Sequence, residues 1–302
     1  MTIEIVSGLS KYQVIEKVAD AEVYQLFLCK QEELSRQLLL QVASEKRFNS
    51  KISQVAFILQ QLKEAANEAE ADYAKTKTDP DDILNYDLGF PDLIDSFVCE
   101  EESGRHINIF GYKHTDDFYY WIPLIKIAKK NQRRIDLRTS AWIVGKFLKL
   151  LAFIHDNGFS VNLMTRKNLL VQPDQHWISI FDWMKAEISF SGVSDRQKRA
   201  DISQMAKSVI LTLGGSPAKG FIPYDEDVEF DEYCKPFSRL GDDSSDIISV
   251  YKKEAFEKYR GFLLRLARGA ESDAGKAHTE FYELIDSLWV RKFYPITTKP
   301  LN

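Results

Sequence analysis

The sequence predicts an α+β fold in which a small strand-rich part, residues 1–113, precedes a larger helical part, residues 114–302. In the first part, short apolar runs are separated by turn residues, which is typical of antiparallel strands. In the second part, apolar residues recur at three-and-four spacing, which is typical of helices that bury one face. A chain of 302 residues is long enough for two lobes of this kind.

Five strands and one helix account for the first part. Three apolar runs with polar turns between them predict an antiparallel meander, and the stripe Ile52, Val55 and Leu59 predicts a helix after it. Two more strands follow a loop rich in acids and proline, so we expect a five-stranded antiparallel sheet with one helix. The strands are Tyr12–Ala19, Glu22–Cys29, Arg36–Ala43, Leu93–Glu101 and His106–Lys113, and the helix is Ser50–Ala74.

Amphipathic helices account for most of the second part. The segment 137–158 has a wide apolar face and stops at an Asn-Gly helix end, so we expect it to be buried. The segment 201–215 has the same spacing, with Asp201 expected as its N-cap and glycines at its end. Two aromatic-rich helices are expected at 255–269 and 277–293.

Composition limits the function classes. The chain has 44% hydrophobic and 28% charged residues with a formal net charge of -5, which argues against a general nucleic-acid binder. Cys29, Cys99 and Cys234 lie far apart and suggest neither a disulfide framework nor a zinc site. No apolar run is long enough to span a bilayer, and the first residues do not read as a signal peptide. We therefore expect a cytoplasmic protein without a membrane partner.

Two polar residues frame a predicted hairpin. The runs "NLLVQ" and "HWISIFD" flank a Pro-Asp turn, so Asn168 and Asp182 are expected at the same open end. An amide and a carboxylate oxygen, completed by phosphate and water, suit Mg²⁺. The alternative is structural, with an Asn that caps a turn and an Asp that closes a strand.

The order of these elements resembles the protein-kinase-like fold, including divergent bacterial members. The resemblance rests on "LLAFIHDNG", Asn168, the hairpin ending in "DWM" and the helix "DISQMAKSVILTLGG", in that order. It implies that Asn168 and Asp182 take the places of the metal-binding residues that hold Mg²⁺ with ATP. It also implies that Asp201 braces the backbone of the loop before the hairpin.

Several kinase positions are degenerate. Leu163 stands where a kinase carries the aspartate that orients the substrate hydroxyl, and leucine accepts no proton. Gln41 stands at the position of the phosphate-binding lysine, and Val55 or Gln54 at that of its glutamate partner. The turn "VADAEVYQL" has no glycine with which to approach phosphates.

These losses lead to a functional hypothesis with an alternative. The leading interpretation is a pseudokinase that acts as a scaffold or regulator for another protein, with no cofactor or with weak binding of Mg²⁺ and ATP. The alternative is a divergent phosphotransferase or nucleotidyl transferase that uses Asn168 and Asp182 with magnesium.

Two charged segments stay open. The basic run "KIAKKNQRRIDLR", residues 126–138, is either an anionic docking face or a solvated helix and turn. The acidic run "DEDVEFDEY", residues 225–233, lacks the glycine and ligand spacing of a calcium loop and is expected to be a solvated loop.

Overall fold

The computed structural model describes residues 4–8, 10–31, 36–79, 82–113, 118–130, 132–223, 245–288, 296 and 298–300. The chain divides into two compact units. The first contains residues Met1–Trp121 and Ser179–Ala186, and the second contains Ile122–Ile178 and Glu187–Asn302. Cys234 and the acidic run 225–233 lie outside the described residues.

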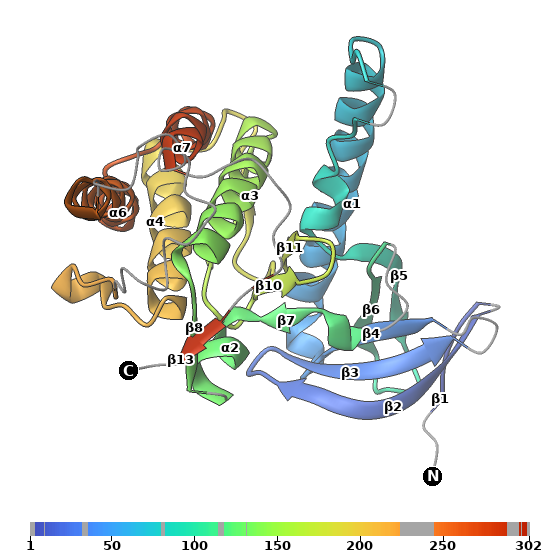
Figure 1. The fold of residues 1–302 in the computed structure, drawn as a ribbon. Helices are drawn as coiled ribbons and strands as arrows, with labels where there is room; N and C mark the ends of the chain where they lie inside the picture. Colours follow the sequence, from blue (N-terminus) through green and yellow to red (C-terminus); the bar gives the residue numbers. More distant parts are fainter. Residues whose placement is uncertain are drawn as a thin grey trace. The chain divides into compact units, whose positions relative to one another are not determined.

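A six-stranded antiparallel sheet forms the first unit, with the order β1-β2-β3-β4-β6-β5 (Figure 1). The α+β fold class and all five expected strands are confirmed. The count of five was too low because a short strand precedes them and turns back at Gly8, whose φ is 57°. The strands are β1 (Glu4–Ser7), β2 (Ser10–Asp20), β3 (Tyr24–Gln31), β4 (Gln37–Ala43), β5 (Asp92–Cys99) and β6 (Arg105–Gly111).

The long helix α1 (Asn49–Ala74) packs on strands β4, β5 and β6. It forms because Ile52, Val55 and Leu59 recur on one side and become buried. Its first residue fixes the register, since the Asn49 side chain donates to Gly104 O at 2.8 Å and accepts from the N–H of His106 at 2.9 Å. Short 3₁₀ turns at Lys46–Phe48 and Tyr86–Gly89 complete the connections around this helix.

Helices dominate the second unit. In Figure 1, α3 lies beside α4 and α7, and α4 lies beside α6. The expected helix 137–158 is confirmed as α3, where Asp136 caps the first turn by accepting from the N–H of Thr139 at 2.6 Å. The helices are α2 (Leu124–Lys130), α3 (Leu137–Asp156), α4 (Asp195–Thr212), α6 (Ser245–Ala267) and α7 (Ala274–Leu288).

The expected cap of α4 was wrong. The helix begins at Asp195, and Ser194 is its N-cap, in a capping box with Gln197. Asp201 lies inside the helix with its side chain buried. The polar first turn "DRQKRA" carries no apolar periodicity, so the sequence pattern did not reveal that the helix starts there.

Short strands hold the loops of the second unit, and one of them, β11, continues into the first unit from Ser179. The predicted hairpin of β10 and β11 is confirmed, and β7 pairs with β10 on its other side. Two more antiparallel pairs join β9 to β12 and β8 to β13. The strands are β7 (Ile122–Pro123), β8 (Arg133–Ile135), β9 (Phe159–Ser160), β10 (Leu169–Gln172), β11 (Trp177–Ile180), β12 (Glu187–Ile188) and β13 (Thr298–Pro300).

Among the described residues, no helix is long and apolar enough to cross a membrane.

Candidate functional site

Asp201 holds the loop that follows α3. One of its carboxylate oxygens accepts a hydrogen bond from the backbone N–H of Asn162 at 2.7 Å, and the other accepts one from Val161 at 2.8 Å. Nε2 of His155, in the last turn of α3, lies 3.1 Å from the second oxygen. Two helices and the loop between them therefore meet at one fully buried carboxylate. The two backbone bonds are of the kind that the kinase resemblance assigns to this aspartate.

Leu163 occupies the next position in this loop. Its side chain is half-buried, and its carbonyl oxygen accepts a hydrogen bond from Asn168. The following N–H, of Met164, donates to Gln204 at 2.8 Å. The loop is thus held by the Asp201 carboxylate before Leu163 and by the side-chain amides of Asn168 and Gln204 after it. The hydrocarbon side chain of Leu163 itself can neither accept nor donate a proton.

The side-chain amide of Asn168 is used within its own loop. Its oxygen accepts from the N–H and the hydroxyl of Thr165, at 2.7 and 3.0 Å, and its nitrogen donates to Leu163 O at 2.7 Å. An amide oxygen has two lone pairs, and both acceptor positions are taken here. A Mg²⁺ ion at this oxygen would have to displace Thr165, so the amide in this arrangement does not fit a metal.

Asp182 lies just after β11 and belongs to the first unit. Its Oδ1 accepts from the N–H of Met184 at 3.0 Å, and its Oδ2 accepts a long hydrogen bond of 3.4 Å from the hydroxyl of Tyr24. Burial raises the pKa of the Asp182 carboxyl, against the opposing effects of Met184, Tyr24 and Lys185. Burial and the nearby carboxylate together raise the pKa of Tyr24.

Gln41 belongs to a buried row of neutral polar groups across three strands. Its Oε1 accepts from Asn108 Nδ2 at 3.2 Å, and the same nitrogen donates to Ile52 O in α1 at 2.8 Å. Ser96 donates to Asn108 Oδ1 at 2.8 Å and lies 2.8 Å from His106 Nε2. Because a hydroxyl has one hydrogen, His106 Nε2 must be the donor in that second contact. Burial lowers the pKa of His106, which keeps the row uncharged.

The turn between β2 and β3 is closed by its own backbone. Ala21 N–H donates to Tyr24 O at 2.9 Å, and Ser44 N–H donates to Val23 O at 2.9 Å. No residue from Val18 to Tyr24 has a positive φ. The turn therefore has ordinary side chains in an ordinary conformation, and it lacks the bare backbone that a phosphate-binding loop offers.

The structure separates the two candidates for the glutamate position on α1. Val55 is buried on the helix face that packs on the sheet, whereas Gln54 is exposed. At the position where a kinase carries this glutamate, the residue of α1 that faces the sheet is therefore an aliphatic valine.

Sequence reasoning missed Tyr24 and Asn108. Both depend on strand register, since Tyr24 pairs with Ala43, Leu26 with Gln41, and Gln41 with Asn108. Residues directly opposite in antiparallel strands share a face, so Tyr24 lies on the same face as Gln41. The period-two alternation of "YQLFL" was the signal that could have placed the tyrosine there.

Asn168 and Asp182 belong to different units, and each is described within its own unit. That they converge on one metal ion stays a prediction.

The comparisons with solved structures show a protein-kinase-like fold. Vaccinia related kinase 3 is similar with a TM-score of 0.56 and 12% identity, covering 95% of this chain and 90% of its own. The BubR1 kinase domain has a TM-score of 0.54 and 10% identity, covering 94% and 88%. A double mutant of the Mycobacterium tuberculosis PknI kinase domain has a TM-score of 0.50 and 12% identity, covering 91% and 96%.

No protein-family model matches the sequence, and no curated protein matches it. At 10 to 12% identity these structures establish the fold alone. The chain therefore has the architecture of a protein kinase, and its chemistry has to be argued from its own residues.

Proposed function

We propose that this protein is a pseudokinase: a kinase-like cytoplasmic protein that does not transfer phosphate, binds nucleotide weakly or not at all, and acts as a scaffold or regulator by binding another protein. The single observation that carries the proposal is the contact between Tyr24 and Asp182. It places a bulky phenol against the carboxylate that in the resemblance holds the metal.

The charges around this carboxylate support the proposal. Phosphoryl transfer needs cations that neutralise the phosphates, supplied in kinases by a lysine and by Mg²⁺. Gln41 is neutral and is committed to Asn108, so no lysine acts at that position. A nucleotide phosphate brought to Asp182 would meet a second negative charge, and repulsion between the two weakens binding.

The loop of the second unit supports the same conclusion. Both acceptor positions of the Asn168 oxygen are filled by Thr165, and Leu163 offers no group to orient a nucleophile. Losing a phosphate-bound cation and a positioning residue each costs several kcal/mol of transition-state stabilisation. Phosphotransfer is therefore not expected, which leaves binding as the use of the fold.

The proposed compartment rests on the cysteines. Cys29 and Cys99 are free thiols buried in the first unit. Burial raises the pKa of both thiols, which keeps them protonated and unreactive, as suits a protein of a reducing compartment.

A thermal-unfolding titration tests the nucleotide statement. The protein is heated with ATP or GTP, with and without Mg²⁺ or Mn²⁺, beside the variant Asp182→Ala and the control Asp174→Ala, which changes an exposed turn residue. A ligand at one hundred times its dissociation constant would add about 2.7 kcal/mol of stability, which such a titration detects readily. We expect no shift at millimolar nucleotide.

Transfer of labelled phosphate from ATP tests the catalytic statement directly. We expect no label above background on the protein or on a general acceptor protein. A metal-dependent thermal shift that Asp182→Ala abolishes and Asp174→Ala keeps, together with transfer above background, would overturn the proposal in favour of a magnesium-dependent transferase.

A further inference from the structure

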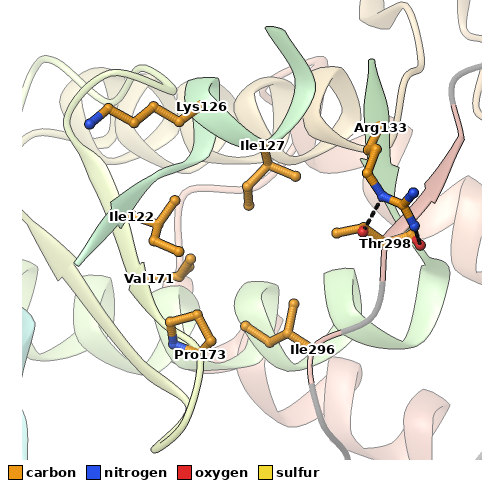
Figure 2. A pocket seen from close by; sticks show the side chains of 8 residues that line it. All are labelled: Ile122, Lys126, Ile127, Arg133, Val171, Pro173, Ile296 and Thr298. Atoms are coloured by element: carbon orange, nitrogen blue, oxygen red, sulfur yellow. Dashed lines mark hydrogen bonds between the residues drawn. The ribbon is translucent and has the colours of Figure 1, made fainter. Parts of the chain in front are cut away.

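The second unit contains an apolar pocket of about 340 Å³. Figure 2 shows its side chains arranged around an open centre, contributed by β7, α2, β10, the following turn and the segment near β13. Pockets of this size that are mostly apolar, with few polar groups, are typical of binding sites. The apolar residues that line it are Ile122, Ile127, Val171, Pro173 and Ile296.

Strand pairing fixes the walls of the pocket. Val171 and Ile122 are opposite each other in β10 and β7, so their side chains share one face. On the other side, Arg133 donates to the hydroxyl and to the carbonyl oxygen of Thr298, each at 2.6 Å. These two bonds use Nε and Nη2 and hold β13 against β8, as the dashed line in Figure 2 partly shows. The pocket is thus a built feature of the unit.

Positive charge borders the apolar centre. Lys126 and Arg133 line the pocket and are both exposed, and in Figure 2 the Lys126 amine extends away from the centre of the pocket. They belong to the basic run, in which residues 126–134 hold five Lys or Arg and no Asp or Glu. In a chain with a formal net charge of -5, this concentration is local. An apolar pocket and a cationic border therefore occupy the same place.

We propose that this pocket docks an acidic segment of a partner protein, with one large aliphatic or aromatic side chain of that segment in the pocket and carboxylates beside it on Lys126 and Arg133. The inference rests on the proposed function in that it names where the partner binds. It also chooses between the two interpretations of the basic run, in favour of an anionic docking face.

The chemistry of the pocket selects this partner. An apolar anchor in a desolvated pocket supplies most of the affinity of such an interface, while charges at the rim set specificity and association rate. Nη1 of Arg133 takes part in neither bond to Thr298, so it is available to a carboxylate. Basic peptides would be repelled by the same border, which distinguishes partners by charge.

The test uses a displayed library of random peptides selected on the full-length protein. We expect the enriched sequences to combine an aliphatic or aromatic residue with neighbouring Asp or Glu. An enriched acidic-apolar peptide, labelled with fluorescein, should then bind in solution by polarisation, and more weakly at high salt because the border charges are screened.

Three variants locate the binding. Lys126→Glu places a negative charge where the peptide carboxylates bind, so repulsion replaces attraction and the affinity for the labelled peptide should fall about tenfold or more. Ile127→Trp fills the pocket and should abolish binding. Lys207→Glu is the matched control, since it reverses an exposed lysine of α4 that does not line the pocket, and its affinity should match that of the natural protein. Thermal unfolding of each variant shows that it is folded, and Lys126→Glu keeps the test decisive if Ile127→Trp does not fold.

The outcomes separate the possibilities. Enrichment of basic or charge-indifferent peptides, absence of any enriched family, or equal affinity for the natural protein and Lys126→Glu would overturn the proposal. If the natural protein is a dimer and Ile127→Trp a monomer, the occupant is a second copy of the chain, which also overturns it. Phosphate transfer bears on the pseudokinase proposal alone, so a failure of the pocket and a failure of that proposal are distinguishable.

Discussion

The hydroxyl of Tyr24 lies 3.4 Å from Oδ2 of Asp182, and both residues belong to the first unit although the stretch Ile122–Ile178 between them belongs to the second. The tyrosine side chain reaches this carboxylate from the first residue of β3, directly after the closed turn. The Tyr24 ring lies beside Asp182, and its hydroxyl donates a hydrogen bond to one oxygen of that carboxylate. The glycine-free turn before β3 therefore leads directly into a side chain that packs against Asp182.

Tyr24→Phe removes this hydroxyl and keeps the ring. The buried carboxylate then lacks one donor, and because the bond is long we expect a loss of roughly 1 kcal/mol in the free energy of unfolding. Tyr120→Phe, which changes an exposed tyrosine, is the control and should have little effect. Urea unfolding measures both. An unchanged midpoint for Tyr24→Phe would mean that the contact contributes nothing to stability.

Asp182→Asn tests the electrostatic cost of the carboxylate. The pKa of Asp182 is raised in the folded state, so the folded chain holds this proton more tightly than the unfolded chain does. The extra stability that this tightly held proton gives the folded protein is fully present below the unfolded pKa of about 3.9. It is lost as pH rises through the folded pKa.

The stability of Asp182→Asn relative to the natural protein should therefore increase between pH 4 and pH 7. Urea unfolding across this range, with Asp174→Asn as an exposed control, measures the difference. A difference that falls as pH rises would contradict the raised pKa.

Gln41→Lys introduces the residue type that a kinase carries at this position, but it should not restore nucleotide binding. Lysine cannot accept the hydrogen bond from Asn108, and its charge would enter a buried neutral row. We expect a loss of roughly 1–3 kcal/mol and no ATP-induced thermal shift. Gln13→Lys, on the exposed side of β2, should be neutral. A stable Gln41→Lys variant that binds MgATP would show that this one residue blocks the site.

Asp201→Ala should destabilise the second unit strongly. The backbone N–H groups of Val161 and Asn162 lose their acceptor, and His155 loses its partner in the core. We expect roughly 3 kcal/mol, because hydrogen bonds to a buried charged group are the stronger kind. Asp195→Ala, on the exposed first turn of the same helix, is the control. Guanidinium unfolding compares them, and equal midpoints would refute a bracing role.

Two glycines should respond to alanine in opposite directions. A Cβ at Gly145 would lie 2.7 Å from the Phe281 ring, and Phe262, with its centroid 5.8 Å from that ring, limits how far Phe281 can move away. Gly145→Ala should therefore cost about 1–3 kcal/mol of stability. Gly261, within α6, has no atom within 4 Å of such a Cβ. Gly261→Ala should therefore add about 0.5–1 kcal/mol. Thermal unfolding measures both variants, and a loss of stability in Gly145→Ala alone would confirm that α3 and α7 approach each other closely here.

Elements with strong periodicity were predictable, and elements held by tertiary pairing were not. The spacing of apolar residues gave α1, α3 and the main strands because burial of one face is what stabilises them. The strand β1 is short and β13 spans Thr298–Pro300, so each exists through its partner strand and leaves little pattern of its own. The start of α4 is set by a polar capping box, which carries no periodicity.

The candidate site divides in the same way. Gln41, Asn168 and Asp182 could be singled out because a resemblance in element order assigns them places, as it does Leu163. What these residues contact could not be predicted, since the partners Asn108, Thr165 and Tyr24 come from strand register and loop geometry. The pocket likewise combines β7, β10 and β13, which are separated along the chain.

The segment Ser179–Ala186 belongs to the first unit, where Trp183 packs edge-on against Phe90 with centroids 6.2 Å apart. During translation this unit cannot finish when the ribosome has made residue 121, because its last stretch is encoded well beyond that point. Proteins made from the N-terminus usually fold domain by domain. Here the six strands of the sheet are complete at that point, but the nascent chain must wait for residues 122–178 of the second unit before Trp183 can reach Phe90, so a chaperone would meet a first unit with a complete sheet and an incomplete core.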